Sequence, residues 1–150
     1  MLRKLAFIVL AVLSACTRPS APAAGYVILP ATGVKECSLG MDVADFTRVF
    51  GGEQNGEYIH SDPNGIEARV KDGKIAALFF HYISPTFTPF NGASDLGIGR
   101  DSTAGDVMAK YGKPDRVGER VLDELGEKPG AHEKSLEYRH LGIDFTFWDQ

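Results

Sequence analysis

The sequence has little cysteine, only one long apolar run and no excess of basic residues. Its two cysteines are Cys16 and Cys37. If Cys16 is modified, no intramolecular disulfide can form, so the fold has to be stabilised by a hydrophobic core. The formal net charge of -4 lacks the basic footprint that is typical of nucleic-acid-binding proteins. After the N-terminal segment, no apolar run approaches the roughly 20 residues that a membrane-spanning helix needs.

The N-terminal segment is built like a secretory signal peptide. Arg3 and Lys4 precede the apolar run Leu5–Leu13, and small residues then lead to Cys16. The Leu-Ser-Ala-Cys sequence that ends at Cys16 resembles the lipobox of bacterial lipoproteins, in which the cysteine becomes the acylated first residue. The sequence therefore predicts a signal peptide over residues 1–15, cleavage between Ala15 and Cys16, and a lipid anchor on Cys16. The alternative is an ordinary cleaved signal that happens to contain a cysteine.

Residues 16–25 read as the acylated cysteine followed by a Pro- and Ala-rich tether, which has too few large apolar residues to build a core. Several acyl chains on one cysteine give stable membrane attachment, whereas a single chain binds only marginally. In lipoproteins of this kind, an Asp after the cysteine retains the protein in the inner membrane. Thr17 stands there instead. We therefore expect a protein of the bacterial cell envelope, anchored to the outer membrane and facing the periplasm.

Residues 26–150 are predicted to form a single domain that begins with a strand near Tyr26 and contains two weakly similar parts, about 38–83 and 96–150. Each part opens with a short amphipathic helix, over 43–50 and 104–111, whose expected capping residues are Asp42 and Thr103. In each helix an aromatic residue is followed by a glycine suited to the end of a helix.

Alternating apolar and polar residues predict strands over 65–70 and 142–147. Asp72-Gly73 predicts a hairpin turn into a longer strand over 75–83, whereas the second part ends where its last strand would start. A polar stretch over 117–134 is interpreted as a loop with at most one turn of helix. The expected fold is α+β: two tandem repeats of a helix plus an antiparallel meander, the helices packed on one face of the sheet, the second repeat lacking its last strand.

The second part also resembles a known family, and the first part does so more loosely. The matching residues are Gly97-Ile98-Gly99-Arg100-Asp101-Ser102-Thr103, Asp106-Val107, Tyr111-Gly112-Lys113-Pro114-Asp115, Tyr138 and Gly142-Ile143-Asp144-Phe145. They resemble the BamE/SmpA-type small outer-membrane lipoproteins and the related repeats of β-lactamase-inhibitor-like proteins. The resemblance implies helices on a three-stranded antiparallel sheet, and proteins as binding partners. The matched positions are caps, turns and core residues, so no contact residue can be transferred.

No catalytic or metal-binding pattern is visible in the sequence. The four histidines, His60, His81, His132 and His140, have no metal-site spacing. His60 and His140 could occupy related strand positions as a paired site, although two separate surface histidines are the simpler interpretation. No nucleophile elbow or dinucleotide loop is present. We therefore expect no cofactor, no metal, no evident small-molecule substrate and no enzymatic activity.

An aromatic surface is the best candidate for binding. Phe87 and Phe90 lie in a Pro-rich loop, where they are either tucked beneath it or exposed to a partner. Trp148 should point away from the core if the alternation of the last strand holds, because its neighbour Phe147 points inward. Phe87, Phe90 and Trp148 are the predicted partner-binding residues. Cys37 is either a small buried residue or a thiol that pairs with another chain.

These features favour a lipid-anchored periplasmic module that binds another envelope protein, such as an outer-membrane assembly or maintenance factor. The alternative is an inhibitor or immunity lipoprotein that neutralises a periplasmic enzyme. In that version an acidic loop around Asp123, Glu124 and Glu127 would meet a basic target. An enzyme is the least favoured hypothesis because no acid–base or nucleophile pair is recognisable.

Overall fold

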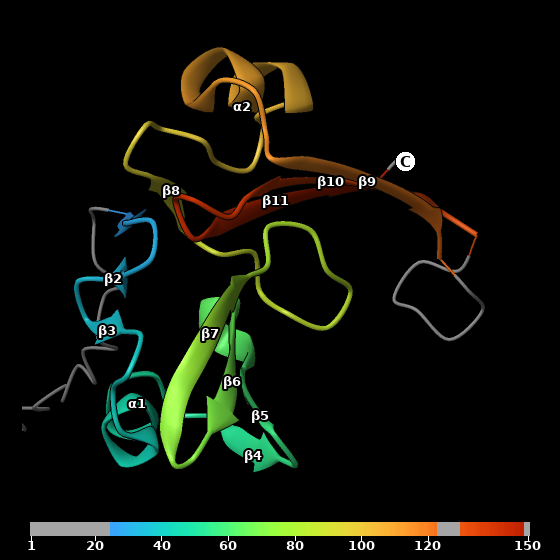
Figure 1. Ribbon diagram of the computed structural model, residues 1–150. Helices are drawn as coiled ribbons and strands as arrows, with labels where there is room; N and C mark the ends of the chain where they lie inside the picture. The colour runs from blue at the N-terminus through green and yellow to red at the C-terminus, as the bar shows by residue number, and fades with distance from the viewer. Residues whose placement is uncertain (1–24, 123–129, 149–150) are drawn as a thin grey trace, which may run out of the picture.

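The computed structural model describes residues 25–122 and 130–148. The predicted signal peptide, Ala15, Cys16, residues 17–24 of the tether and the acidic residues Asp123, Glu124 and Glu127 lie outside the described residues. Within them, the fold is a mixed α+β arrangement in which strands dominate and the main sheets are antiparallel (Figure 1).

The first half runs through a helix and its surrounding strands: β1 (Tyr26–Ile28), β2 (Gly33–Val34), β3 (Cys37–Ser38), α1 (Val43–Phe50), β4 (Glu53–Asn55), β5 (Tyr58–Ser61), a single 3-10 turn (Asp62–Asn64), β6 (Ile66–Lys71) and β7 (Lys74–Phe80). The second half contains β8 (Gly92–Ser94), α2 (Ala104–Tyr111), β9 (Arg116–Val121), β10 (His132–Tyr138) and β11 (Ile143–Trp148).

Strands β4 to β7 form a four-stranded antiparallel sheet in sequence order. The predicted hairpin is confirmed: Asp72 and Gly73 join β6 to β7 with positive φ values of 51° and 73°. A turn with two positive φ angles matches the twist of the flanking strands, which is why Asp-Gly sequences favour it. β7 ends at Phe80, before the expected end of that strand at residue 83.

Helix α1 packs on this sheet through Phe46 and Phe50, one helical turn apart. Their rings meet the buried side chains of Ile59, Ile66 and Ile75 in a first core cluster. Burying a large apolar side chain contributes about 1.5–3 kcal/mol, so this cluster dominates the stability of the first half.

Strands β9, β10 and β11 form a second antiparallel sheet with β10 at its centre, and α2 lies against one face (Figure 1). Val107 of α2 packs with Ile98, Leu136 and Tyr138 in a second core cluster. Ile143, Phe145 and Phe147 border that cluster, so the predicted inward face of the last strand is confirmed.

The loop interpretation of residues 117–134 is wrong at both ends. Residues 117–121 belong to β9, and β10 already begins at His132. The sequence of β9 shows no alternation of apolar and polar residues, because β9 is an edge strand whose side chains are mostly exposed and charged. Its backbone pairs with β10 from Arg116↔Glu137 to Val121↔His132, and such pairing requires no apolar side chains.

Two sets of contacts join the halves: the pairing of β1 with β8, and the packing of Ile143 of β11. β1 forms where the sequence predicted a first strand, and it pairs in parallel with β8 through Tyr26↔Gly92 and Ile28↔Ser94. Ile143 of β11 packs against both core clusters. The halves therefore share side chains and backbone contacts.

The two helix starts differ, although both were expected to be capped. Thr103 and Asp106 form a full capping box: Thr103 N–H donates to Asp106 Oδ2 over 2.8 Å, and Asp106 N–H donates to Thr103 Oγ1 over 3.2 Å. Asp42 holds the N-cap position of α1 but makes no side-chain capping bond. Its Oδ1 instead lies 2.8 Å from Lys74 Nζ. A long-range ion pair has replaced the local cap there.

Candidate functional site: the polar face of the second sheet

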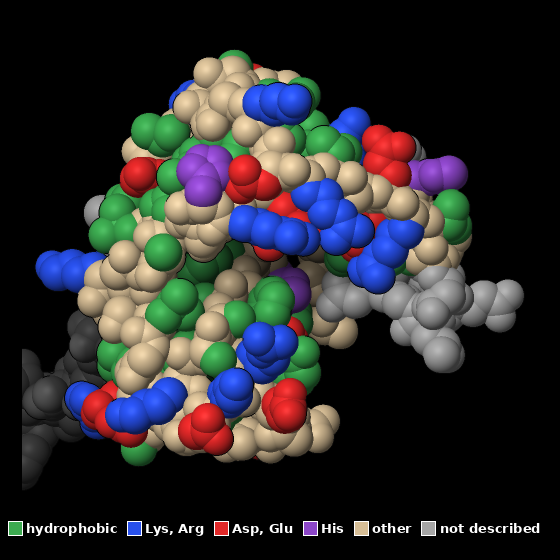
Figure 2. Space-filling view, viewed as in Figure 1, with side chains coloured by type: hydrophobic (Ala, Val, Ile, Leu, Met, Phe, Trp, Pro, Cys, Tyr) green, Lys and Arg blue, Asp and Glu red, His purple; other side chains and the backbone are tan. Residues whose placement is uncertain are grey.

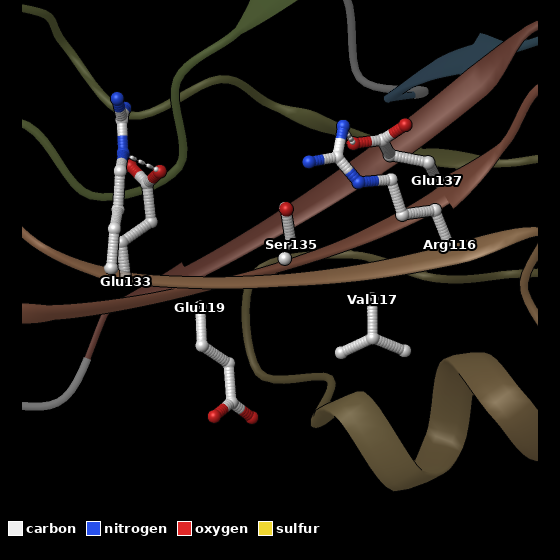
Figure 3. Close-up of a pocket in the computed structure, with 8 residues that line it drawn as sticks. Arg116, Val117, Glu119, Glu133, Ser135 and Glu137 are labelled. Atoms are coloured by element: carbon white, nitrogen blue, oxygen red, sulfur yellow. Dashed lines mark hydrogen bonds and ion pairs between the residues drawn. The ribbon is translucent and has the colours of Figure 1, made fainter.

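The second sheet has one apolar and one polar face. Leu136 and Tyr138 of β10 point toward α2, and Glu137 between them points to the opposite side because side chains alternate along a strand. Figure 3 shows this alternation on β9 as well, with Val117 and Glu119 on the side of α2. The strand register assigns the following side chains to the side away from α2, called the polar face below: Arg116, Gly118, Arg120, Glu133, Ser135, Glu137, Asp144, Thr146 and Trp148.

Two cross-strand ion pairs dominate the polar face. Arg120 Nε donates to Glu133 Oε1 over 2.6 Å, and Arg116 Nη1 lies 3.4 Å from Glu137 Oε1. The carboxylates are mostly covered, with 13% and 18% of their side chains exposed, while the arginines are 69% and 63% exposed. Figure 2 shows basic and acidic side chains next to one another over the front of this sheet. Both guanidinium groups are therefore exposed at the surface, whereas their carboxylate partners are covered.

Glu133 is held in its charged form by two donors. Hydrogen bonds from Arg120, and more weakly from Trp148, lower the pKa of its carboxyl below the usual value. The second bond runs from Trp148 Nε1 to Glu133 Oε2 over 3.0 Å. Because both carboxylate oxygens are engaged, Glu133 fixes the positions of an arginine and a tryptophan on the same surface.

A hollow of about 530 Å³ lies between the two ion pairs. Gly118 and Ser135 are its floor, where they face each other across β9 and β10. A Cβ atom at position 118 would come too close to Ser135 Oγ, so a larger residue there would require the Ser135 hydroxyl to rotate away. Among the described residues no histidine lines this hollow, and its charged lining consists of two arginines and three glutamates.

Of the two interpretations of Phe87 and Phe90, burial beneath the loop is confirmed, because only 7% and 3% of their surface is exposed. Phe90 stacks on Tyr26 with 5.5 Å between ring centroids and belongs to the first core cluster. Phe87 stacks on His81 at 4.1 Å. The Pro-rich loop therefore turns its phenylalanines inward, which speaks against the predicted partner-binding role of Phe87 and Phe90.

Trp148 lies where the alternation predicted it. Its neighbour Phe147 borders the second core cluster, whereas the Trp148 indole lies half-buried on the polar face against Glu133. A partner-binding role for Trp148 stays a prediction.

The histidines His60 and His140 do not form a joint site. His60 Nδ1 lies 3.0 Å from Glu67 in the first sheet, and His140 Nδ1 lies 2.7 Å from Asp115 beside the second. His140 also sits in the turn after β10, so the expectation of related strand positions is wrong. Residues 25–122 and 130–148 contain no group of three or more His, Cys, Asp or Glu side chains that could hold a metal ion.

Cys37 is fully buried in the first core cluster, so its thiol should be unreactive in the folded protein. Burial raises the pKa of this thiol to about 11, which lowers the thiolate population roughly a hundredfold relative to an ordinary cysteine. We expect N-ethylmaleimide to label Cys37 at least that much more slowly in native protein than in urea, as followed by mass spectrometry. The folded state keeps the proton, so this contribution to stability is complete below about pH 9 and is lost as the pH rises through about 11.

Rapid native labelling of Cys37 would instead mean that the first core opens readily. It would also restore the second interpretation of this cysteine, as a thiol that pairs with another chain.

None of the helices in the described ranges is long and apolar enough to cross a membrane.

Comparisons of the chain with protein-family models, with curated proteins and with solved structures gave no significant match. The residues of the polar face are therefore assigned from geometry, charge and exposure.

Proposed function

We propose that this protein is a lipid-anchored binding module of the bacterial envelope and that it contacts another envelope protein through the polar face. The observation that carries the proposal is the set of exposed arginines fixed by covered carboxylates around the hollow at Gly118 and Ser135. Arginine and tryptophan are the residue types most enriched among the energetically important positions of protein interfaces.

The proposed location is the outer membrane, with the domain facing the periplasm, and it rests on the lipobox-like residues before Cys16 and on Thr17. The resemblance to BamE/SmpA-type lipoproteins supports a role in assembly or maintenance of the envelope. In this proposal α1 with β4–β7 and α2 with β9–β11 are two repeats of one unit. The second would lack the strand that corresponds to β7.

We expect a partner with polar groups of both signs, because the two arginines of the polar face are balanced by the carboxylates of Glu133, Glu137 and Asp144. The glutamates keep the exposed arginine side chains in place at this surface. Such contacts add specificity and speed of association more than affinity, and they weaken as salt screens the charges.

Charge removal on the polar face gives a direct test. We expect the double substitution Arg116→Ala and Arg120→Ala to weaken capture of the partner about tenfold or more, because truncation of a central interface arginine costs upwards of 1 kcal/mol. Capture would be measured by crosslinking in intact cells, purification under mild detergent and quantitative mass spectrometry. Arg48→Ala is the matched control, since Arg48 is 72% exposed on α1, far from the polar face in the sequence and on the other half.

If the double variant and the control capture the partner equally well, the partner does not bind through the polar face. Recovery of outer-membrane barrel components with the native protein supports the assembly role, and their complete absence contradicts it.

An inhibitor or immunity lipoprotein is the second candidate, and the acidic residues Asp123, Glu124 and Glu127 favour it. It would act on a basic surface of a periplasmic enzyme, which the same crosslinking would identify. Deleting the gene should then make cells more sensitive to neighbouring toxins or to lysozyme, and unchanged sensitivity would contradict this candidate. An enzyme remains the least favoured proposal.

A further inference from the structure

The outer edge of β9 has no partner strand among the described residues. The sheet order is β11-β10-β9, so one side of β9 pairs with β10 and the other side is open. An open edge presents unpaired backbone N–H and C=O groups, and natural proteins usually protect it with charges, short length or a cover. β9 runs over Arg116–Val121 and is not covered by α2 in Figure 1.

The alternation of the ladder identifies which backbone groups face outward. Leu122 N–H donates to Ala131 O on the side of β10. In an antiparallel ladder the N–H and C=O groups of a residue point to the same side, and successive residues alternate. The backbone groups of Val117, Glu119 and Val121 therefore point to the open edge.

The side chains of those same residues are unusual for an open edge. Val117 and Val121 are 50% and 58% exposed, although both are apolar and only four positions apart. Glu119 lies between them, and its Oε1 is 3.3 Å from Lys134 Nζ of β10. The single acidic group at the centre of the edge is thus already balanced by a base of its own chain.

We propose that a second copy of this chain pairs with β9 along this edge, antiparallel and with the two-fold axis at Glu119. In this register Val117 of each copy lies opposite Val121 of the other, and the three outward residues all find backbone partners. Apolar residues opposite one another are the pairs that stabilise antiparallel strands.

The same register fixes the charges near the axis. The two Glu119 side chains lie opposite each other, and each is paired on its outer side with Lys134 of its own chain, so the order across the joined sheet is base, acid, acid, base. On the polar face, Arg120 of each copy lies opposite Gly118 of the other, where no side chain obstructs it. The next register, centred on Gly118, would place Val117 opposite Glu119 and so separate the valines, which is why the valine pairs favour the register centred on Glu119.

A single cysteine introduced at the axis tests the register in the full chain. In the Glu119→Cys variant the two Cα atoms would lie about 5.5 Å apart, within the range of a disulfide. We expect mild oxidation of membranes that contain this variant to produce a covalent dimer. The native cysteines are not expected to interfere, since Cys37 is buried and the proposed function places a lipid on Cys16.

Two matched variants separate this dimer from chance contacts. In Val121→Cys the introduced residues would be about 13 Å apart along the strands, too far for a disulfide. Glu53→Cys places a cysteine on β4, the exposed edge of the other sheet. Crosslinking at position 119 alone supports the proposal. Equal crosslinking at 119 and 53, or none at 119, overturns it, and preferential crosslinking at 121 overturns the register.

A measurement without cysteines gives a second readout. We expect Val117→Lys to weaken dimerisation of the detergent-solubilised full chain about tenfold or more in sedimentation experiments, because it replaces two valine pairs. Val49→Lys, at a valine of α1 that is 44% exposed, should leave the dimer unchanged. Glu119→Gln should not weaken it. A dimer insensitive to Val117→Lys contradicts the proposed pairing, whatever the result for the envelope partner.

Discussion

Replacing Cys16 with serine is expected to abolish lipid attachment completely. A serine hydroxyl is not the thiol that forms the thioether in the resembled lipoproteins, so incorporation of radiolabelled palmitate should fall to background. The precursor should also keep residues 1–15, because the predicted cleavage follows acylation in such proteins, and it should migrate more slowly in gel electrophoresis. If residues 1–15 are exchanged for an ordinary cleavable signal, Cys16→Ser should be recovered in the periplasmic fraction, because the proposed membrane attachment depends on the lipid at Cys16.

Cys37→Ala provides the matched control, because it removes the other cysteine of the chain. This variant loses a small buried side chain of the first core cluster and should still incorporate palmitate in full. Continued labelling of Cys16→Ser, or loss of labelling in Cys37→Ala, would contradict the assignment of the anchor.

Replacing Tyr138 with alanine should cause the largest loss of stability in the second half. Tyr138 is fully buried, and its ring packs against Tyr111 and Phe145 with centroid distances of 5.6 and 6.1 Å. Truncation of a buried aromatic side chain typically costs about 3–5 kcal/mol, while whole domains are stable by only about 5–15 kcal/mol. Urea unfolding of the mature chain, followed by circular dichroism, would measure the change in the free energy of unfolding.

Two further tyrosine variants separate the role of the ring from that of the hydroxyl. Tyr138→Phe keeps the ring but loses the hydrogen bond from Tyr138 Oη to Gly112 O, 2.9 Å long, and should cost about 1 kcal/mol. Tyr58→Ala, at a tyrosine of β5 that is 36% exposed, should cost clearly less than Tyr138→Ala. Similar losses for Tyr138→Ala and Tyr58→Ala would mean that the second core contributes little.

Local chemistry was predicted well from the sequence. The two helices, the cap at Thr103 and the Asp72-Gly73 hairpin all depend on interactions between residues close in the chain, and their signals are present in the residues themselves. The missing cap at Asp42 has a long-range cause, since its carboxylate pairs with Lys74 across the sheet. No local pattern contains that contact.

Strands without an apolar face were not predictable in the same way. β9 has glycine, two arginines and a glutamate among its residues, and it forms because its backbone pairs with β10. β8 has only three small residues and forms by parallel pairing with the distant β1. Such pairing is decided by the whole fold, which is why strand propensity depends strongly on context.

The polar face was missed for the same reason. Its ion pairs join β9 to β10, so they could be recognised only after both segments were assigned as strands. One signal was available: the run from Glu133 to Tyr138 alternates, with Leu136 and Tyr138 on one side and Glu133, Ser135 and Glu137 on the other. Trp148 was placed correctly because its neighbour Phe147 belongs to an apolar series that was visible in the sequence.

If Cys16 is acylated, the start of β1 at Tyr26 limits the distance between the folded domain and the membrane. Tyr26 N–H is bound to Asn91 O over 2.9 Å, so the fold holds the chain from this residue onward. With Cys16 acylated, the residues from Thr17 to Gly25 can extend to at most about 30 Å, given roughly 3.3–3.6 Å per residue. The domain would then sample a thin layer beside the bilayer, in which its local concentration toward membrane-bound targets is high and encounters occur by lateral diffusion.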